Sequence, residues 1–340
     1  MKRISISLVS LGVAILSAGA AEARDQLHIV GSSTVYPFST AVAEEFGKGG
    51  NFKTPIVEST GTGGGLKLFC SGVGEGTPDI ANASRKIKDS EIEACKANGV
   101  TSITEVPIGY DGIVIANAKS EQRYDLTRQQ VWLALAKEVP QDGKLVPNFY
   151  KSWNEISADL PAEKIEVLGP PPTSGTRDAF VELVMDAGCK GIPEIEAITD
   201  AKAKTGACSA IREDGAWTDA GENDNLIVQK LSANPKALGV FGYSFLEENL
   251  DRLQGSNIDG VDPDFDHIVS GAYPVSRTMY FYVKNQHDGQ VPGIREFVAE
   301  FTSEKAAGEE GYLADKGMIP FPTEKLEEVQ KSAGELQPMM

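Results

Sequence analysis

The first third of the chain alternates short apolar runs with segments of helical periodicity. After the run at residues 27–31, apolar residues recur every three or four positions as far as Phe46, which is the spacing of one helix face. Such alternation is typical of α/β folds, in which helices cover a largely parallel sheet. Strands are predicted over residues 27–31, 54–58, 79–83, 103–108 and 112–116, with helices beginning near residues 35, 66 and 89.

The same style continues to the C-terminus with longer connections. A strand is predicted at residues 278–283, and helices are predicted over residues 291–301, 304–314 and 324–331. The chain is long enough for two lobes. We predict lobe I from residues 24–109 plus 272–340 and lobe II from residues 110–271, with two crossings and a hinged cleft between them.

The N-terminus has the pattern of an export signal. Lys2 and Arg3 precede a mostly apolar stretch at residues 4–16, and a small-x-small cleavage pattern ends at Ala23. Ala20 is the next candidate for cleavage. The apolar stretch is too short to span a bilayer, and no cysteine follows it to carry a lipid anchor. The sequence predicts a signal peptide at residues 1–23 and a soluble product exported to the periplasm.

The cysteines fit an oxidising compartment. All four lie after the predicted signal peptide, and none belongs to a Cys-x-x-Cys pair, which argues against redox catalysis and a cysteine zinc site. Of the three pairings we favour the one that joins sequence neighbours. The alternative is four separate buried thiols. The predicted disulfides are Cys70–Cys95 and Cys189–Cys208.

Charge and histidine content exclude several classes of function. The formal net charge of -17 argues against nucleic acid and anionic membranes as partners. It leaves room for a small anion in a locally positive pocket. Only three histidines are present, and none has the spacing of a zinc hydrolase, so no metal or other cofactor is expected.

Three segments share one design, in which a strand, a turn rich in hydroxyls and glycine, and a helix follow one another. They are residues 31–37, 59–66 and 172–178. A helix N-terminus offers unpaired N–H groups and partial positive charge, and glycine lets the backbone approach a ligand. A single such turn is also what ordinary helix capping produces. Three of them, distributed over both lobes, predict a site for a tetrahedral oxyanion.

The glycine-rich turn does not fit a nucleotide site. Leu66 stands where a dinucleotide fingerprint needs glycine, and Lys67 is not followed by Ser or Thr. Nucleotide binding is therefore unsupported.

Four motifs in order, GSSTVYP, ESTGTGGGLKLF, DIANASRKI and PPTSGTRDAF, resemble the PstS-type phosphate-binding proteins, the receptors of a phosphate ABC transporter. The resemblance covers essentially the whole chain after residue 23. It implies a two-lobed, type II periplasmic-binding-protein (Venus flytrap) fold that closes on one phosphate. It also implies that the phosphate is held by residues of these motifs, namely Thr34, Val35, Thr62, Ser84, Ser174, Gly175 and Thr176.

The sequence departs from the family pattern at two positions. Arg85 follows Ser84 where many members carry Asp, and Pro170 stands where many carry arginine. We hypothesise that Arg85 and Arg177 share the cationic role, because a guanidinium makes paired hydrogen bonds to a phosphate. The alternative is that either arginine pairs with a nearby carboxylate on the surface.

The missing family Asp bears on selectivity, because a carboxylate accepts a proton from phosphate but repels sulfate, which carries none. We name Asp111, at the first predicted crossing, as its replacement; the alternative is an ordinary turn-forming Asp before glycine. Asp178 is a weaker candidate, since an acid in a first helical turn is common. Arg277 either reaches the anion or braces the hinge, and we favour bracing.

The predicted function is that of a monomeric, non-catalytic receptor that captures inorganic phosphate and delivers it to an ABC permease. A receptor for another tetrahedral oxyanion, such as sulfate, arsenate or a phosphonate, is the alternative. A secreted phosphatase of the same fold would need a base or metals, and the scarcity of histidine leaves no obvious base.

Overall fold

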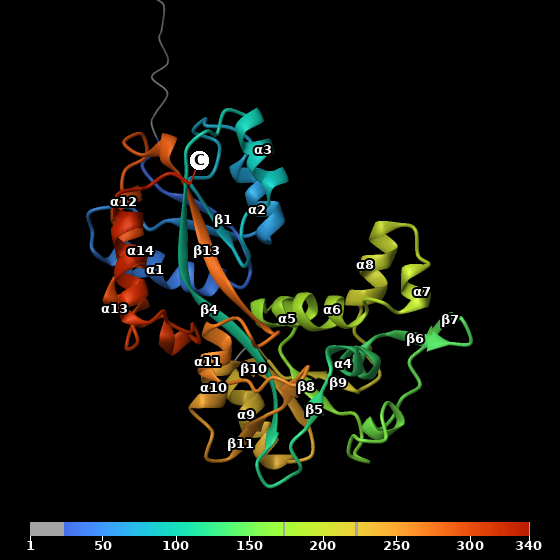
Figure 1. Cartoon of the computed structure of the whole chain (residues 1–340). Helices are drawn as coiled ribbons and strands as arrows, with labels where there is room; N and C mark the ends of the chain where they lie inside the picture. The colour runs from blue at the N-terminus through green and yellow to red at the C-terminus, as the bar shows by residue number, and fades with distance from the viewer. Residues whose placement is uncertain (1–23, 173, 222–223, 340) are drawn as a thin grey trace, which may run out of the picture.

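The computed structural model describes residues 24–172, 174–221 and 224–339, and its helices and strands form two lobes (Figure 1). The predicted two-lobed α/β fold is confirmed, whereas the predicted signal peptide lies outside the described residues. Lobe I is built on a sheet whose strands lie in the order β2 (Ile56–Ser59), β1 (His28–Gly31), β3 (Ile80–Ala83), β13 (Ser276–Lys284) and β4 (Ile103–Ala118).

The sheet of lobe I is mixed. β1 pairs in parallel with β2 and β3, so these strands end at one edge of the sheet. The antiparallel β13 lies between β3 and β4 and pairs with both. The βαβ pattern of the first third therefore predicts the parallel strands, but it could not predict a strand inserted from far along the chain.

Helices cover both faces of this sheet (Figure 1). Their apolar sides form two clusters, one packed under α1 and the C-terminal helices and one under α2 and α3. The helices of lobe I are α1 (Tyr36–Lys48), α2 (Thr62–Phe69), α3 (Asp89–Ala97), α12 (Ile294–Phe301), α13 (Glu304–Ala307) and α14 (Thr323–Gly334), with 3-10 turns at Asn285–His287 and Ala314–Lys316.

The helix predicted over residues 304–314 is wrong beyond its first turn. α13 ends at Ala307, and Gly308 and Gly311 follow. Glycine loses more backbone entropy in a helix than any other residue, so two glycines in four positions favour a turn. The apolar residues that suggested a longer helix, Ala306 and Leu313, are both buried, but they belong to separate short segments.

β4 passes through both lobes as one strand. Its first part pairs with β13 as far as Gly112, and from Ile113 onward it pairs with β10 (Leu238–Gly242) of lobe II. The strand predicted at residues 112–116 is therefore the continuation of the strand at 103–108. Next to it, the Ile113 N–H donates to the Val275 carbonyl just before β13, at 2.9 Å. Both connections between the lobes lie side by side.

Lobe II has its own sheet and core. Its core contains the buried side chains of Trp132, Trp153 and Phe180. The sheet continues from β10 to β8 (Val167–Gly169) and β9 (Trp217–Asp219), and β11 (Leu253–Gly255) also pairs with β4. Short pairs are formed by β5 (Asp125–Leu126) with β12 (Asn257–Ile258), and by β6 (Glu138–Gln141) with β7 (Lys144–Pro147).

The longest helical segment of lobe II begins at the turn predicted to bind the anion. α5 (Gly175–Phe180) continues through a π-helical stretch, Val181–Met185, into α6 (Asp186–Gly188). The other helices are α4 (Arg128–Leu135), α7 (Pro193–Glu196), α8 (Ala201–Ser209), α9 (Asp224–Ala233), α10 (Tyr243–Glu247) and α11 (Phe265–Val269), with a 3-10 turn at Trp153–Glu155.

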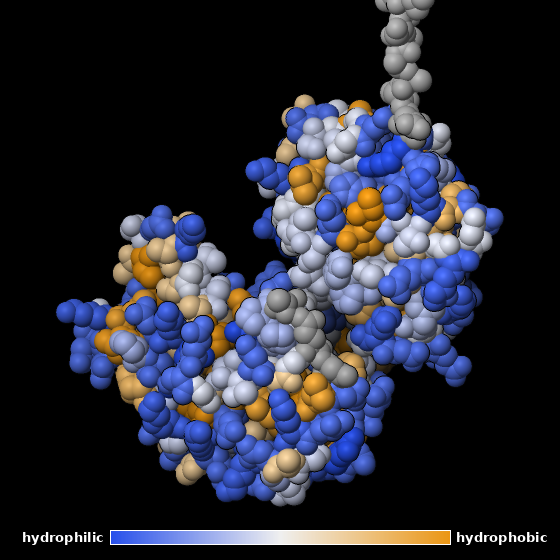
Figure 2. Space-filling view, turned by 180° about the vertical axis from the view of Figure 1, so that it is seen from behind, coloured by the Kyte–Doolittle hydropathy of each residue, from blue (hydrophilic) through white to orange (hydrophobic). Residues whose placement is uncertain are grey.

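A short segment of lobe I joins the two cores at the waist seen in Figure 2. Met318 is buried in the core of lobe I, whereas its neighbour Ile319 is buried in the core of lobe II. Ile319 is tied to β4 by paired backbone hydrogen bonds with Tyr110, of 2.8 and 3.0 Å. The strands that cross between the lobes are therefore braced by a third, non-covalent link.

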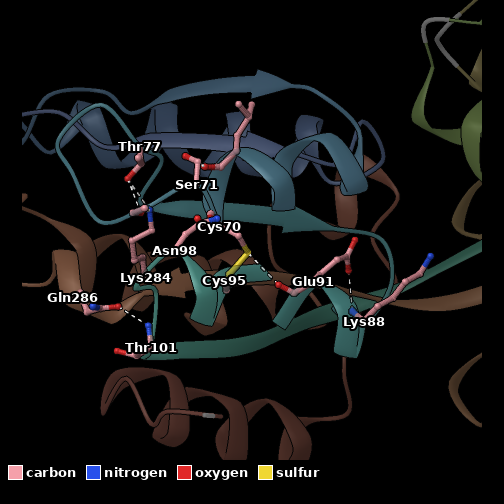
Figure 3. The surroundings of a disulfide bond; sticks show 12 residues. Cys70, Ser71, Thr77, Lys88, Glu91, Cys95, Asn98, Thr101, Lys284 and Gln286 are labelled. Atoms are coloured by element: carbon pink, nitrogen blue, oxygen red, sulfur yellow. Dashed lines mark hydrogen bonds between the residues drawn. A yellow bond between two sulfur atoms is a disulfide. The ribbon is translucent and has the colours of Figure 1, made fainter. Parts of the chain in front are cut away.

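Both predicted disulfides are confirmed. Cys70 bonds to Cys95 and joins the end of α2 to α3 (Figure 3), and Cys189 bonds to Cys208 and joins the segment after α6 to α8. Beside the first bond, the Lys284 ammonium donates to the Gly72 carbonyl and to the Thr77 hydroxyl at 2.7 Å each. No helix of the described ranges is long and apolar enough to cross a membrane.

Candidate functional site

Two helices of lobe I begin at the edge where β1, β2 and β3 end. Backbone hydrogen bonds fix the turns, since the Ser32 N–H donates to Asn82 and the Thr60 N–H donates to Gly31, both at 2.9 Å. Carboxyl ends of parallel strands are where α/β folds place their ligands. The predicted residues of the first three motifs therefore lie together: Thr34, Val35, Thr62, Ser84 and Arg85.

Side chains at this edge are already linked to one another. The hydroxyls of Thr62 and Ser84 share a hydrogen bond of 3.0 Å, and the Ser84 N–H donates to the Thr62 hydroxyl at 3.1 Å. The Val35 N–H faces the Ser32 hydroxyl at 3.4 Å. These groups offer hydroxyl and amide donors within one small region, which is the donor set that a tetrahedral oxyanion requires.

The fourth motif brings lobe II against the start of α1. Ser174 caps α5, because its hydroxyl accepts from the Thr176 N–H at 3.2 Å. Gly175 packs so closely on lobe I that a Cβ there would lie 2.5 Å from Cα of Thr34. The Thr34 hydroxyl also donates to the Gly175 carbonyl at 3.3 Å. The helix N-termini of the two lobes therefore meet face to face.

Two hollows lie between the lobes, and Ser33 and Thr34 line both. The first encloses about 390 Å³ and is lined by Asp111, Ser174, Gly175, Thr176 and Asp224, among others. The second encloses about 240 Å³ and is lined by Thr62, Ser84, Arg85, Asp178, Glu182 and Arg277, among others. We call them the first and the second hollow.

Arg85 faces the second hollow, but its guanidinium is held by Glu91. Both terminal nitrogens donate to the Glu91 carboxylate at 2.9 Å, and Glu91 also accepts from the Lys88 N–H at 2.8 Å. The hydrogen bond with Glu91 raises the pKa of Arg85. The pairing with a carboxylate that the sequence left open is present, and it holds the guanidinium beside the hollow.

Arg177 does not line either hollow. Its guanidinium lies 4.3 Å above the centre of the Trp217 ring and donates to the Pro170 carbonyl at 3.2 Å and to Asp219 at 3.4 Å. Burial lowers the pKa of Arg177. Stacking on tryptophan directs this arginine into lobe II, so the expected pair of Arg85 and Arg177 does not come together in this structure.

Arg277, rather than Arg177, lines the second hollow together with Arg85. Its guanidinium is nearly buried and reaches both lobes. It donates to the Thr34 hydroxyl at 2.9 Å, to Asp111 at 3.3 Å and to Glu182 at 2.6 Å. We favoured a bracing role for Arg277 from the sequence. The structure places it at the hinge and at the second hollow together.

Asp111 lies in β4 next to the crossing and lines the first hollow. Burial raises the pKa of its carboxyl, Arg277 opposes this shift, and the charge of Glu182 adds to it. Its side chain retains an exposed fraction of 13%. A carboxyl poised between burial and a guanidinium is suited to exchange a proton with a ligand.

Asp224 is a second carboxyl of the first hollow that sequence reasoning missed. It begins α9, is 7% exposed, and accepts from the Gly242 N–H at 3.0 Å. Burial raises its pKa to about 6, and the charge of Asp111 contributes to this rise. An acid at a helix N-terminus is ordinary in a sequence. Nothing local indicated that the fold would bring it close to Asp111.

We expect Asp224 to reduce stability at neutral pH. Its folded-state pKa lies above the ordinary 3.8, so the folded state favours the protonated carboxyl. The stability that this protonation gives is fully present below about pH 4 and is lost as the pH rises through 6. Asp224→Asn stays neutral and keeps an acceptor for Gly242. Urea unfolding without phosphate should therefore show that the free energy of unfolding of the variant, relative to that of the wild type, is about 3 kcal/mol higher at pH 7.5 than at pH 4.

The exposed Asp251 of lobe II provides the control, because Asp251→Asn removes a carboxylate that is in water in both states. This variant should follow the wild type at both pH values. An Asp224→Asn variant whose stability relative to wild type is the same at pH 4 and pH 7.5 would contradict the raised pKa.

The three histidines lie outside the two hollows. In the ranges covered by the structure, no group of three or more His, Cys, Asp or Glu side chains is arranged to hold a metal ion. His28 faces Glu58, His267 lies on α11, and His287 is buried against Asp79. None of these histidines is among the residues that line the two hollows.

Comparison with known proteins gives one consistent result. Residues 16–305 match the family model described as the PBP superfamily domain. The chain is 32% identical to Protein SphX of Synechococcus elongatus over 95% of its length and 86% of that protein. It is 29% identical to the phosphate-binding protein PstS of Staphylococcus saprophyticus, over 90% of this chain and 83% of that one.

A solved structure agrees. The crystal structure of a "possible phosphate binding protein" from Planctomyces limnophilus has a TM-score of 0.73 and 28% identity to this chain. The match covers 92% of this chain and 98% of that protein. The match therefore extends over both lobes.

Proposed function

We propose, from the premise that this chain belongs to the PBP superfamily, that it is a receptor that captures inorganic phosphate between its lobes. One observation carries the proposal: the N-termini of α1, α2 and α5, from both lobes, meet at two small hollows beside Arg277. The names of its relatives PstS and of the Planctomyces protein support phosphate as the ligand.

We propose that phosphate is contacted by the motif residues that the family resemblance implies, with one arginine replaced by another. Arg277 takes the place that the sequence assigned to Arg177, and Arg85 contributes from the second hollow. The remaining donors are Thr34, Val35, Thr62, Ser84, Ser174, Gly175 and Thr176. Directional hydrogen bonds in a site sheltered from water supply the affinity, so the acidic surface of the chain does not prevent it.

Proton recognition is the second part of the proposal. Phosphate near neutral pH carries a proton and sulfate does not, so a carboxylate acceptor favours phosphate. Asp111 and Asp224 line the first hollow and are the acceptors that we assign. Two acidic side chains there compensate for Arg85, which stands where many family members carry Asp.

The units that we propose to close are lobe I, residues 24–109 and 272–340, and lobe II, residues 110–271. Closure is a population shift, because the ligand contacts both lobes only when they approach.

We further propose that residues 1–23 direct export to the periplasm, and that the monomeric product delivers phosphate to an ABC permease. We assign no reaction step to the residues that line the hollows.

Calorimetric titration of the exported form, stripped of ligand by unfolding and refolding, tests the proposal. Phosphate should bind tightly with one-to-one stoichiometry, and sulfate should produce no heat. Asp111→Asn should weaken phosphate binding and allow sulfate to bind, since it removes the charge that repels an unprotonated anion. Silence toward both anions would contradict the proposed function. Equal binding of both would contradict the role of Asp111 and Asp224.

A further inference from the structure

Two carboxylates of lobe II face the anion donors of lobe I. Asp178 lies in α5 and Glu182 in the π-helical stretch that follows it, and both line the second hollow. The Ser33 hydroxyl donates to Asp178, and the Arg277 guanidinium donates to Glu182 at 2.6 Å. Residues four apart share one side of a helix, so one face of lobe II presents both acids.

The partner of Glu182, Arg277, is a group that we assign to phosphate. Arg277 also donates to the Thr34 hydroxyl, which stands at the start of α1. Glu182 acts on more than its direct partner, since its charge raises the pKa of both Arg85 and Asp111. Glu182 is therefore within electrostatic reach of Arg85 and Arg277, which line the second hollow from lobe I.

The ion pair between Arg277 and Glu182 differs from a surface ion pair in the burial of one partner. The Arg277 side chain is 9% exposed, whereas that of Glu182 is 51% exposed. Glu182 can therefore withdraw into water, but Arg277 cannot. Insertions of π-helix within α-helices occur frequently at functional sites, and this one contains Glu182.

We propose that Glu182, assisted by Asp178, is a built-in competitor of the phosphate: its carboxylate occupies the Arg277 donor in the empty protein and is displaced when the anion binds. The inference rests on the proposed function. Glu182 thereby determines affinity, because each bound phosphate must displace a charge-assisted hydrogen bond and must lie near a repelling charge. It also holds the lobes together in the absence of ligand, since it joins lobe II to β13.

Two consequences distinguish this role from that of a simple clamp. Removal of the charge frees Arg277 and removes repulsion, so phosphate binding becomes tighter. The same change deletes an ion pair between the lobes, so the empty protein becomes more open. A residue that only stabilised the liganded, closed form would give weaker binding when neutralised.

The test uses Glu182→Gln, with Asp178→Asn as a second variant. Phosphate titrations should give a dissociation constant about tenfold lower for Glu182→Gln and a smaller change in the same direction for Asp178→Asn. Small-angle scattering without phosphate should give a larger radius of gyration for Glu182→Gln than for wild type. Glu213→Gln, an exposed acid of lobe II outside both hollows, should change neither quantity.

The outcomes are separable. Unchanged or weaker phosphate binding by Glu182→Gln, with wild type binding normally, overturns the inference and leaves the proposed function standing. An equal radius of gyration for the two empty proteins overturns the part that concerns lobe closure. A wild-type protein that binds no phosphate overturns the proposed function, and the competitor role falls with it.

Discussion

Replacement of Gly175 by alanine should weaken phosphate binding by about 10- to 100-fold while leaving the folded protein intact. A Cβ at this position would lie 2.5 Å from Cα of Thr34 and 2.7 Å from the Ser33 carbonyl oxygen. Both obstacles are backbone atoms of the other lobe, so no side-chain rotation relieves the clash. Overpacking of this kind costs about 1–3 kcal/mol, and here the cost falls on lobe closure.

The stability of lobe II should not fall, because alanine is preferred over glycine in a helix and Gly175 is the first residue of α5. Gly206→Ala is the matched control: Gly206 lies within α8 of lobe II, and a Cβ added there would meet nothing within 4 Å. Calorimetry should give wild-type affinity for Gly206→Ala. Wild-type affinity for Gly175→Ala would show that the lobes bind phosphate without the approach seen here.

The second large effect, a loss of folding stability, is expected far from the hollows, at Asp79 in lobe I. This carboxylate is 0% exposed and accepts from Arg24, from the His28 N–H at 2.8 Å and from the His287 ring at 2.6 Å. Lys284, also fully buried, lies near it; burial lowers the pKa of Lys284 to about 8, and the charge of Asp79 opposes that shift.

Asp79→Asn should therefore reduce the free energy of unfolding by about 3–5 kcal/mol, since it leaves buried cationic groups without their counter-charge. Urea unfolding with both disulfides intact measures this loss. Asp25→Asn, which breaks an exposed pair with Lys53, should leave the free energy of unfolding close to that of the wild type. Equal stabilities of the two variants would contradict a role for Asp79 as the central acceptor of this cluster.

The fold could be predicted to the extent that its signals are local. The helix at residues 36–48 and the strand at 28–31 follow from apolar spacing, and the sequence-local disulfide pairing was correct. The prediction of a helix over 304–314 failed because apolar periodicity outweighed two glycines. β13 reaches its place between β3 and β4 through pairing with residues that lie far back in the chain, and no local pattern encodes such a partner.

The candidate site divides in the same way. The hydroxyls and amides of the three turns are in place because a glycine- and hydroxyl-rich turn before a helix fixes them within a few residues. The local sequence does not fix the charged groups in this way: Arg177 stacks on Trp217, Arg85 is held by Glu91, and Arg277 enters from β13. Asp224 meets Asp111 only because β10 pairs with β4.

The sequence by itself determined the two-lobed α/β fold, the helix N-termini that face one another and the pairing of the cysteines. Each of these depends on periodicity, turn chemistry or short separation along the chain. Only the tertiary structure decided which arginine reaches the hollows and which acids surround it. A long flexible side chain can reach many partners, and its choice depends on burial and on charges that the fold brings from distant segments.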